Sequence, residues 1–350
     1  MNFDLSEDQQ VIKRTAREFL GARYKLEEVR RLALEEERGF TDAQWEEISG
    51  LGWPELAVAE SGLGIVELAV VAEELGYALA PSPLQSTWAA ALLLDAAGEA
   101  ERLSGGKRGT VAQWDDDTDG APDRSTLDPD GSKLSGVKIA VPDAASADLI
   151  VVTASGGRHF VVDAGADGVT IEPVETLDTT RRLYTVTLDG AEGEELTGAA
   201  DHAFGRAWHA IAVMTAAESV GLGQRAMEMA VEYAKDRTQF ERPIGTYQAV
   251  SHACAQMLLE VEGARSAVLW AAWALDNEPE TAGAATNIAK AYASDCGARV
   301  TASALQVHGG IGFTWEHDLH FFLKRAEANA LTLGGAREHR ARVAELVFDE

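Results

Sequence analysis

The chain has 350 residues, and 57 acidic side chains against 30 basic ones give it a formal net charge of −27. This balance argues against a nucleic-acid binder, which holds phosphates with clustered Lys and Arg, and against electrostatic adhesion to anionic lipid. Hydrophobic residues make up 46% of the chain and charged residues 25%, a composition typical of a globular protein with an acidic surface.

The cysteines and the N-terminal sequence indicate a compartment. Cys254 and Cys296 both lie in apolar helical patterns, so we expect free thiols in a reducing environment. The N-terminal sequence MNFDLSEDQQ carries acids where a signal peptide has basic and apolar residues, and no run reaches the roughly 18 apolar residues of a membrane span. We therefore predict a cytoplasmic protein without membrane association.

The N-terminal part of the chain shows a helical period. Ser6 followed by Gln9 predicts a capping box, and apolar residues then recur at helical spacing. A further helix is predicted over residues 65–77, ended by Gly76 and a proline pair. We assign residues 1–105 to an N-terminal helical domain.

The period then changes to that of short strands. Stretches rich in Val, Ile and Thr are separated by clusters of Asp, Gly and Pro, which is typical of strands and turns. We predict a small antiparallel β domain over residues 106–200, with the acidic stretch 115–130 as a solvated loop. The predicted strands are 138–141, 149–153, 159–162, 169–172 and 183–188.

Long helical patterns return after the β domain. They predict helices over residues 203–236, 248–275 and 281–307, and helices of this length fit a bundle of antiparallel helices. The predicted fold is therefore α+β, with a C-terminal four-helix-bundle domain over residues 201–350.

Two segments combine arginine, glutamine and glycine at helix ends, whereas the common phosphate, zinc and acyl-serine signatures are absent. The first covers residues 237–248, and the second covers 306–313 with His308 beside two glycines. Such groups can hold a pyrophosphate and its nucleotide. The alternative interpretation is that the two segments are ordinary helix ends, because Arg237 complements a helix C-terminus and glycine terminates a helix. One histidine without spaced partners does not predict a metal site.

The residues from Tyr233 to Val250 resemble the R-x-Q-F-G-x-P-I-G-x-F-Q-A motif of acyl-CoA dehydrogenases, and those from Leu305 to His320 are similar to their Q-x-x-G-G-x-G segment. Weaker similarity covers nearly the whole chain, and the family's α–β–α order agrees with the order predicted above. The resemblance implies an enzyme whose FAD oxidises an acyl-CoA to the 2,3-enoyl-CoA while a glutamate removes the α-proton. The residues that it assigns to FAD are Arg237, Thr238, Gln239, Phe240, Tyr247, Gln248, Gln306, Gly309 and Gly310.

Two parts of the family's equipment are missing from the sequence. Gly334 occupies the usual position of the base, and Ile211 occupies the alternative position on the long helix. Glu218 is a weak candidate, because it lies two helical turns from Ile211, about 10.8 Å along the axis, and a structural role is the alternative. Residues 111–120, with three consecutive aspartates, replace the motif that cradles the flavin ring in the family.

The retained residues are those that reach a neighbouring subunit's FAD in the family, whereas the missing ones act within their own subunit. The resemblance therefore implies a non-catalytic subunit that shares FAD across an interface with a catalytic acyl-CoA dehydrogenase subunit. It is similar to the small base-less chains of the α2β2 heterotetramers in actinobacterial steroid side-chain degradation, with an electron-transfer flavoprotein as electron acceptor.

Two alternatives stay open: an independently active homomeric dehydrogenase with another base, and a non-redox scaffold protein of the same family. The acyl-CoA itself is not specified by any residue pattern.

Overall fold

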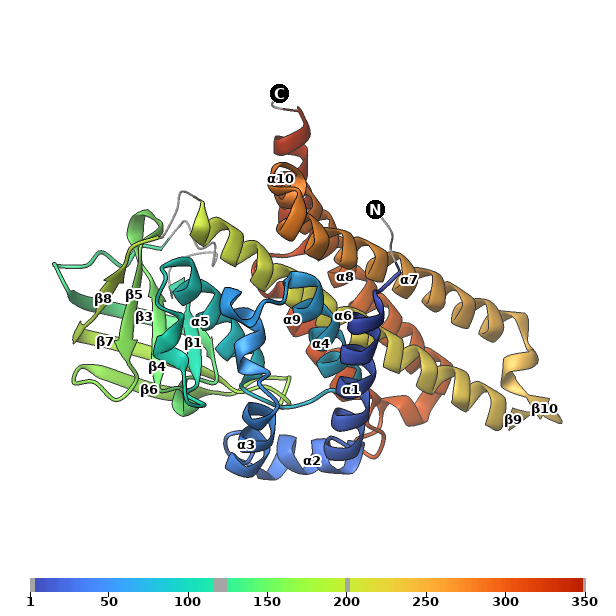
Figure 1. The fold of residues 1–350 in the computed structure, drawn as a ribbon. Helices are drawn as coiled ribbons and strands as arrows, with labels where there is room; N and C mark the ends of the chain where they lie inside the picture. Colours follow the sequence, from blue (N-terminus) through green and yellow to red (C-terminus); the bar gives the residue numbers. More distant parts are fainter. Residues whose placement is uncertain (1–3, 116–124, 199–201, 349–350) are drawn as a thin grey trace. The chain divides into compact units, whose positions relative to one another are not determined.

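The computed structural model describes residues 4–115, 125–198 and 202–348 (Figure 1). Their contacts divide the chain into two compact units, which we call the helical unit and the β unit. The three consecutive domains with boundaries at 105 and 200 stay a prediction. The helical unit comprises Met1–Arg31, Ile65–Ala80 and Ala212–Glu350, and the β unit comprises Leu32–Gly64 and Pro81–Ile211.

The helical unit begins at the predicted capping box. Ser6 Oγ accepts a hydrogen bond from the Gln9 amide, and the Gln9 side chain accepts one from the Ser6 amide. The long helices predicted from periodicity follow in order, and none of the helices in the described ranges is long and apolar enough to cross a membrane. The α-helices of this unit are α1 (Glu7–Arg23), α4 (Ile65–Ala78), α6 (Ala203–Asp236, from Ala212 on), α7 (Gln248–Asn277), α8 (Pro279–His308), α9 (Leu319–Leu331) and α10 (Ala336–Phe348).

Glycines allow α4 and α6 to approach each other closely. Gly76 does not end α4 as the sequence predicted, because the helix continues to Ala78. A Cβ at Gly76 would overlap the carbonyl oxygen of Glu218, and a Cβ at Gly221 would overlap that of Glu73. Gly76 is therefore a packing residue inside the helix, and α4 ends only before the prolines that follow.

The β unit contains two four-stranded sheets with a shared apolar core. All strand pairs of these sheets are antiparallel except β1 with β4, which run parallel. Every residue of β4 is buried, since α5 (Leu84–Ala96) also packs on β1 and β4, and strands covered on both faces read as continuous apolar runs. The sheet orders are β1 (Gly109–Ala112), β4 (Leu149–Thr153), β5 (His159–Asp163), β8 (Glu194–Leu196), and β2 (Trp114–Asp115), β3 (Lys133–Pro142), β7 (Leu183–Glu192), β6 (Val169–Val174).

Asp115 corrects the prediction of a solvated loop over residues 115–130. It pairs with Lys138 in the ladder of β2 and β3, is only 3% exposed, and its carboxylate lies 2.5 Å from Lys138 Nζ. Lys138 also donates to Ser125 Oγ at 2.9 Å, and Ser125 is buried, whereas Asp128 and Asp130 at the far end of the stretch are exposed as predicted. The prediction was wrong for Asp115 because the charge of a side chain does not show whether the fold places a buried cation, here Lys138, beside it. Residues 116–124 lie outside the described ranges.

Candidate functional site

A β-hairpin connects α6 to α7 and carries most of the predicted cofactor residues. β9 (Thr238–Gln239) pairs with β10 (Arg242–Pro243), and the hairpin projects beyond the ends of the two helices (Figure 1). Phe240 and Glu241 at its tip have φ angles of 52° and 67°, the left-handed geometry that a two-residue turn needs to match strand twist. The Phe240 side chain is 87% exposed.

Arg237 is fixed at its backbone and open at its side chain. Its amide donates to Tyr233 O at 2.8 Å, and its carbonyl accepts from the Ile244 amide at 2.8 Å. Its side chain is exposed and makes no hydrogen bond or ion pair within the described ranges. A guanidinium presents five donors in a planar fork, so Arg237 is free to bind an anion.

Tyr247 and Gln248 stand at the start of α7. The Tyr247 hydroxyl donates to Gln239 O at 3.2 Å, and the Arg242 guanidinium lies 4.0 Å from the centre of the Tyr247 ring. These two contacts of Tyr247 stabilise the hairpin. The side chain of Gln248 is exposed.

The second motif lies at the end of α8. The Gln306 side chain is exposed in the last turn, and Gly309 ends the helix with a φ of 64°. No atom lies within 4 Å of a Cβ built at Gly309 or Gly310, so these glycines expose bare backbone, which a ligand can approach closely.

The structure brings the two motifs together through one aromatic contact. The ring of Tyr233, on α6, stacks on the ring of His308, the last residue of α8, at a centroid distance of 4.5 Å and an interplanar angle of 21°. Neither residue had a binding role in the sequence-based prediction. The available signal was their position: Tyr233 lies one helical turn before Arg237, and His308 immediately precedes Gly309.

The donor set at this end of the helical unit fits a pyrophosphate and nucleotide. Guanidinium groups bind phosphate oxygens in a bidentate manner, and exposed carboxamides and backbone near glycine suit a nucleotide. FAD contains both parts, so these residues can hold its ADP half.

Residue 334, the usual base position, is unsuited to a carboxylate side chain of its own. Gly334 has a φ of 98°, a conformation that residues with a side chain rarely adopt. A Cβ at this position would lie 3.0 Å from Glu338 Oε2. At the alternative position, Ile211 is 7% exposed and apolar.

The titratable groups beneath Gly334 are occupied by structural contacts. Lys290, fully buried, donates to Ser294 Oγ at 2.9 Å, to Asn329 O at 3.0 Å and to Gly334 O at 3.4 Å. Burial lowers the pKa of Lys290 to about 8. His339 Nδ1 lies 2.7 Å from Asn287 Oδ1, and burial, together with the Lys290 charge, lowers the pKa of His339 to about 4.

Glu218, the weak candidate for the base, lies in a buried ion pair. Its Oε1 accepts from Arg325 Nη1 at 2.7 Å and its Oε2 accepts from Asn329 Nδ2 at 2.7 Å, and the residue is 1% exposed. Both carboxylate oxygens are engaged, which favours the structural role over that of a base.

Asp115 belongs to the stretch that replaces the family's flavin cradle, and its side chain has no free oxygen facing a flavin. Asp115 turns inward to Lys138, and a carboxylate so engaged cannot donate to a flavin ring. The Asp115 carboxylate therefore does not fit the flavin half of FAD, whereas the exposed groups near Arg237 fit the ADP half.

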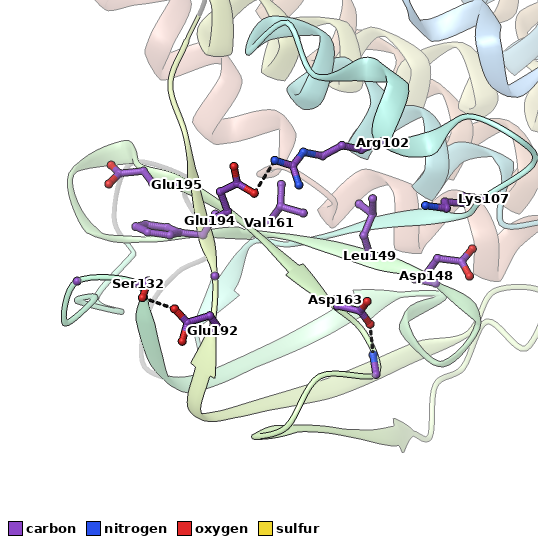
Figure 2. Close-up of a pocket in the computed structure, with 15 residues that line it drawn as sticks. Arg102, Lys107, Ser132, Asp148, Leu149, Val161, Asp163, Glu192, Glu194 and Glu195 are labelled. Carbon is purple, nitrogen blue, oxygen red and sulfur yellow. Dashed lines mark hydrogen bonds and ion pairs between the residues drawn. The ribbon is translucent and has the colours of Figure 1, made fainter.

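A cavity of about 990 Å³ in the β unit is separate from the predicted residues. Figure 2 shows Glu194 reaching Arg102, and Ser132 contacting Glu192. An acidic wall repels the phosphates of CoA and FAD, so this cavity is a poor site for either. Its carboxylate residues are Asp148, Asp163, Glu192, Glu194 and Glu195.

Comparison with known proteins gives the family. Residues 6–102 match the model of the acyl-CoA dehydrogenase N-terminal domain, and residues 206–348 match that of the C-terminal domain. The chain belongs to the acyl-CoA dehydrogenase family. Acyl-CoA dehydrogenase IpdE2 of Mycolicibacterium smegmatis is 32% identical to it, over 98% of this chain and 100% of that protein.

Two solved structures are also similar over nearly their whole length. A variant of the Tcur3481–Tcur3483 steroid acyl-CoA dehydrogenase is 30% identical, with a TM-score of 0.88 and 98% of each chain covered. The ChsE4–ChsE5 complex from Mycobacterium tuberculosis is 28% identical, with a TM-score of 0.87 and 99% of each chain covered. The predicted order of helical, β and helical regions is thereby confirmed.

Proposed function

We propose that this chain is the non-catalytic subunit of a heteromeric FAD-dependent acyl-CoA dehydrogenase and that it supplies the ADP half of an FAD site to a catalytic partner. The observation that carries the proposal is the contrast between Arg237 and Gly334. The first is an exposed cation with an open side chain in the described ranges, and the second is a glycine in a conformation unsuited to a catalytic carboxylate.

The division of labour follows from this contrast. Arg237 would bind the FAD pyrophosphate, with Gln248, Gln306 and the backbone at Gly309 and Gly310 against the rest of the ADP half. FAD, when bound, supplies the hydride acceptor. Removal of the weakly acidic α-proton needs a positioned base, which we assign to the partner.

The relatives support the partner and the substrate class. The two solved structures are named by two gene products each, and one is a steroid acyl-CoA dehydrogenase. We infer a homologous acyl-CoA dehydrogenase chain as partner, in an α2β2 arrangement, and a steroid side-chain acyl-CoA as substrate, bound through that partner. An electron-transfer flavoprotein is the inferred electron acceptor.

The test is co-purification with the product of an adjacent acyl-CoA dehydrogenase gene, followed by counting flavins per complex. We expect the chain alone to be colourless and inactive, and the complex to be yellow and to reduce an electron acceptor with acyl-CoA. A chain that alone binds one FAD per subunit and oxidises acyl-CoA would overturn the proposal.

Arg237→Ala tests the site itself. Loss of a charge-assisted contact of about 1.5–3 kcal/mol should weaken FAD binding by the complex roughly 10- to 150-fold. The matched control is Arg340→Ala, which removes an exposed arginine on α10 that pairs with Asp295. The control should retain wild-type flavin content, and equal flavin content in both variants contradicts the role of Arg237.

A further inference from the structure

We propose that His308 is a positioning residue. Through its stack on Tyr233 it holds the two proposed cofactor-binding motifs at a fixed position relative to each other, which we call their register. The neutral pair of His308 and His317 makes this register sensitive to acid. The inference rests on the proposed function, because the register matters only if both motifs bind one ligand.

The stack joins the two motifs at their nearest helical residues. Tyr233 O accepts the hydrogen bond of the Arg237 amide, and His308 is covalently joined to Gly309. His308 is 4% exposed, and its ring is 4.5 Å from that of Tyr233. A displacement of either ring therefore moves Arg237 relative to Gly309.

The loop that follows α8 also packs on His308. The His317 ring lies 4.6 Å away at an interplanar angle of 60°. A Cβ at Gly312 would come within 3.0 Å of His308 Cβ, so the loop backbone packs directly on this histidine. His308 is therefore held between α6 and its own loop.

The hydrogen bonds show that Nδ1 carries a proton in His308 and none in His317, so His317 is neutral. His308 Nδ1 lies 2.8 Å from Ala304 O, an acceptor, so Nδ1 carries the proton and Nε2 is the nitrogen that acid would protonate. His317 Nδ1 accepts from the Leu319 amide at 3.2 Å, so this nitrogen is unprotonated. Two protonated rings at this separation would repel each other.

The surroundings favour the neutral states. Burial lowers the pKa of both histidines, and His308 lowers that of His317 further. Asp318 opposes this shift at His317, but Arg30 from α2 (Leu26–Glu35) binds the Asp318 carboxylate at 2.6 Å and itself adds to the lowering of the His317 pKa. Tyr233 faces His308 from α6. Because the folded-state values are lowered, the stabilisation is complete above the ordinary histidine pKa, about 6.5, and is lost as the pH falls below it.

The experiment measures the Kd of the partner complex for FAD, by titrating the apo complex at pH 7.5 and pH 5.5. His308→Ala removes the ring and should raise the Kd about tenfold at pH 7.5, as expected for loss of a stacked aromatic pair. His308→Phe keeps an aromatic ring that cannot be protonated. The complex with this variant should bind FAD nearly as tightly as the wild-type complex at pH 7.5, and its Kd for FAD should rise less than that of the wild type between pH 7.5 and pH 5.5. Tyr233→Leu should resemble His308→Ala.

A double variant separates positioning from a general loss of structure. If His308 acts by placing Arg237, His308→Ala in an Arg237→Ala background should cause little further loss of FAD binding. Circular dichroism and the Tm of each chain identify variants that do not fold, for which His308→Phe and Tyr233→Leu remain as tests.

The possible outcomes distinguish the two proposals. If Arg237→Ala weakens FAD binding and both His308→Ala and Tyr233→Leu leave it unchanged, positioning by His308 is wrong and the proposed function stands. If the wild-type complex holds no FAD, or Arg237→Ala has no effect, the proposed function itself fails. If acidification weakens FAD binding by the His308→Phe complex as much as by the wild-type complex, the acid sensitivity does not arise at His308.

Discussion

The end of the helical unit that we propose to bind FAD and the region around Gly334 are both built from helix ends, yet their polar groups have opposite surroundings. Arg237, Gln248 and Gln306 are exposed, and their side chains make no hydrogen bond or ion pair in the described ranges. Around Gly334, Lys290 and Glu218 are buried and hydrogen-bonded. The first arrangement is suited to an external ligand, whereas the second stabilises the fold. Substitutions should therefore affect binding in one region and stability in the other.

The largest effect is expected where the buried ion pair is broken. Glu218→Gln leaves the Arg325 guanidinium without its carboxylate, which costs about 3–5 kcal/mol when the pair is buried. The free energy of unfolding from urea titration measures it. The control is Glu28→Gln, which breaks the pair with Arg31 on the surface of α2 and should cost about 1 kcal/mol or less. Equal losses in the two variants contradict a structural role for Glu218.

The second prediction is that protonation of His339 lowers the stability of the fold at acidic pH. Its pKa of about 4 lies below the usual value near 6.5, so the unfolded chain binds the proton more readily and stability falls with pH from about 6.5 towards 4. Between pH 7 and pH 5 this histidine should account for about 2 kcal/mol of lost stability. His339→Gln should remove that loss in urea titrations at the two pH values. His252→Gln on the exposed side of α7 should not.

A third effect tests the close approach of α4 and α6. Gly76→Ala forces a methyl group against the Glu218 carbonyl, and overpacking of this kind costs about 1–3 kcal/mol. The control is Gly21→Ala in α1, where no atom lies within 4 Å of the added methyl. Alanine should stabilise that helix by up to about 1 kcal/mol. Thermal unfolding of both variants gives the comparison, and a destabilised Gly21→Ala with an unaffected Gly76→Ala would contradict it.

The smallest effect is expected at the proposed FAD-binding end. Arg237→Ala in the isolated chain should change the free energy of unfolding by less than about 0.5 kcal/mol, because an exposed side chain without contacts contributes little. The same substitution should weaken FAD binding by the complex. A large loss of stability in the isolated chain would show that Arg237 has a structural role and would remove the contrast between the two regions.

Local patterns in the sequence predicted the longest helices and strands of the described ranges. The capping box at Ser6, the helix over residues 203–236 and the strand over 149–153 are in the structure as predicted, because each depends on neighbours within a few residues. β1, β2 and β8 were missed because strands of two to four residues are too short to show a period. The motifs of the candidate site were found for the same reason as the helices, since each is a continuous segment.

The sequence by itself determined the family, the order of helical and β regions, and the glycine at the usual base position, because motifs and periodicity are local. Only the tertiary structure decided which polar groups are engaged: Glu218 binds Arg325, which is 107 residues away, and Asp115 binds Lys138 on the neighbouring strand. It also decided that Tyr233 meets His308. Partners of this kind lie far apart along the chain, and packing between elements rather than any local pattern brings them together.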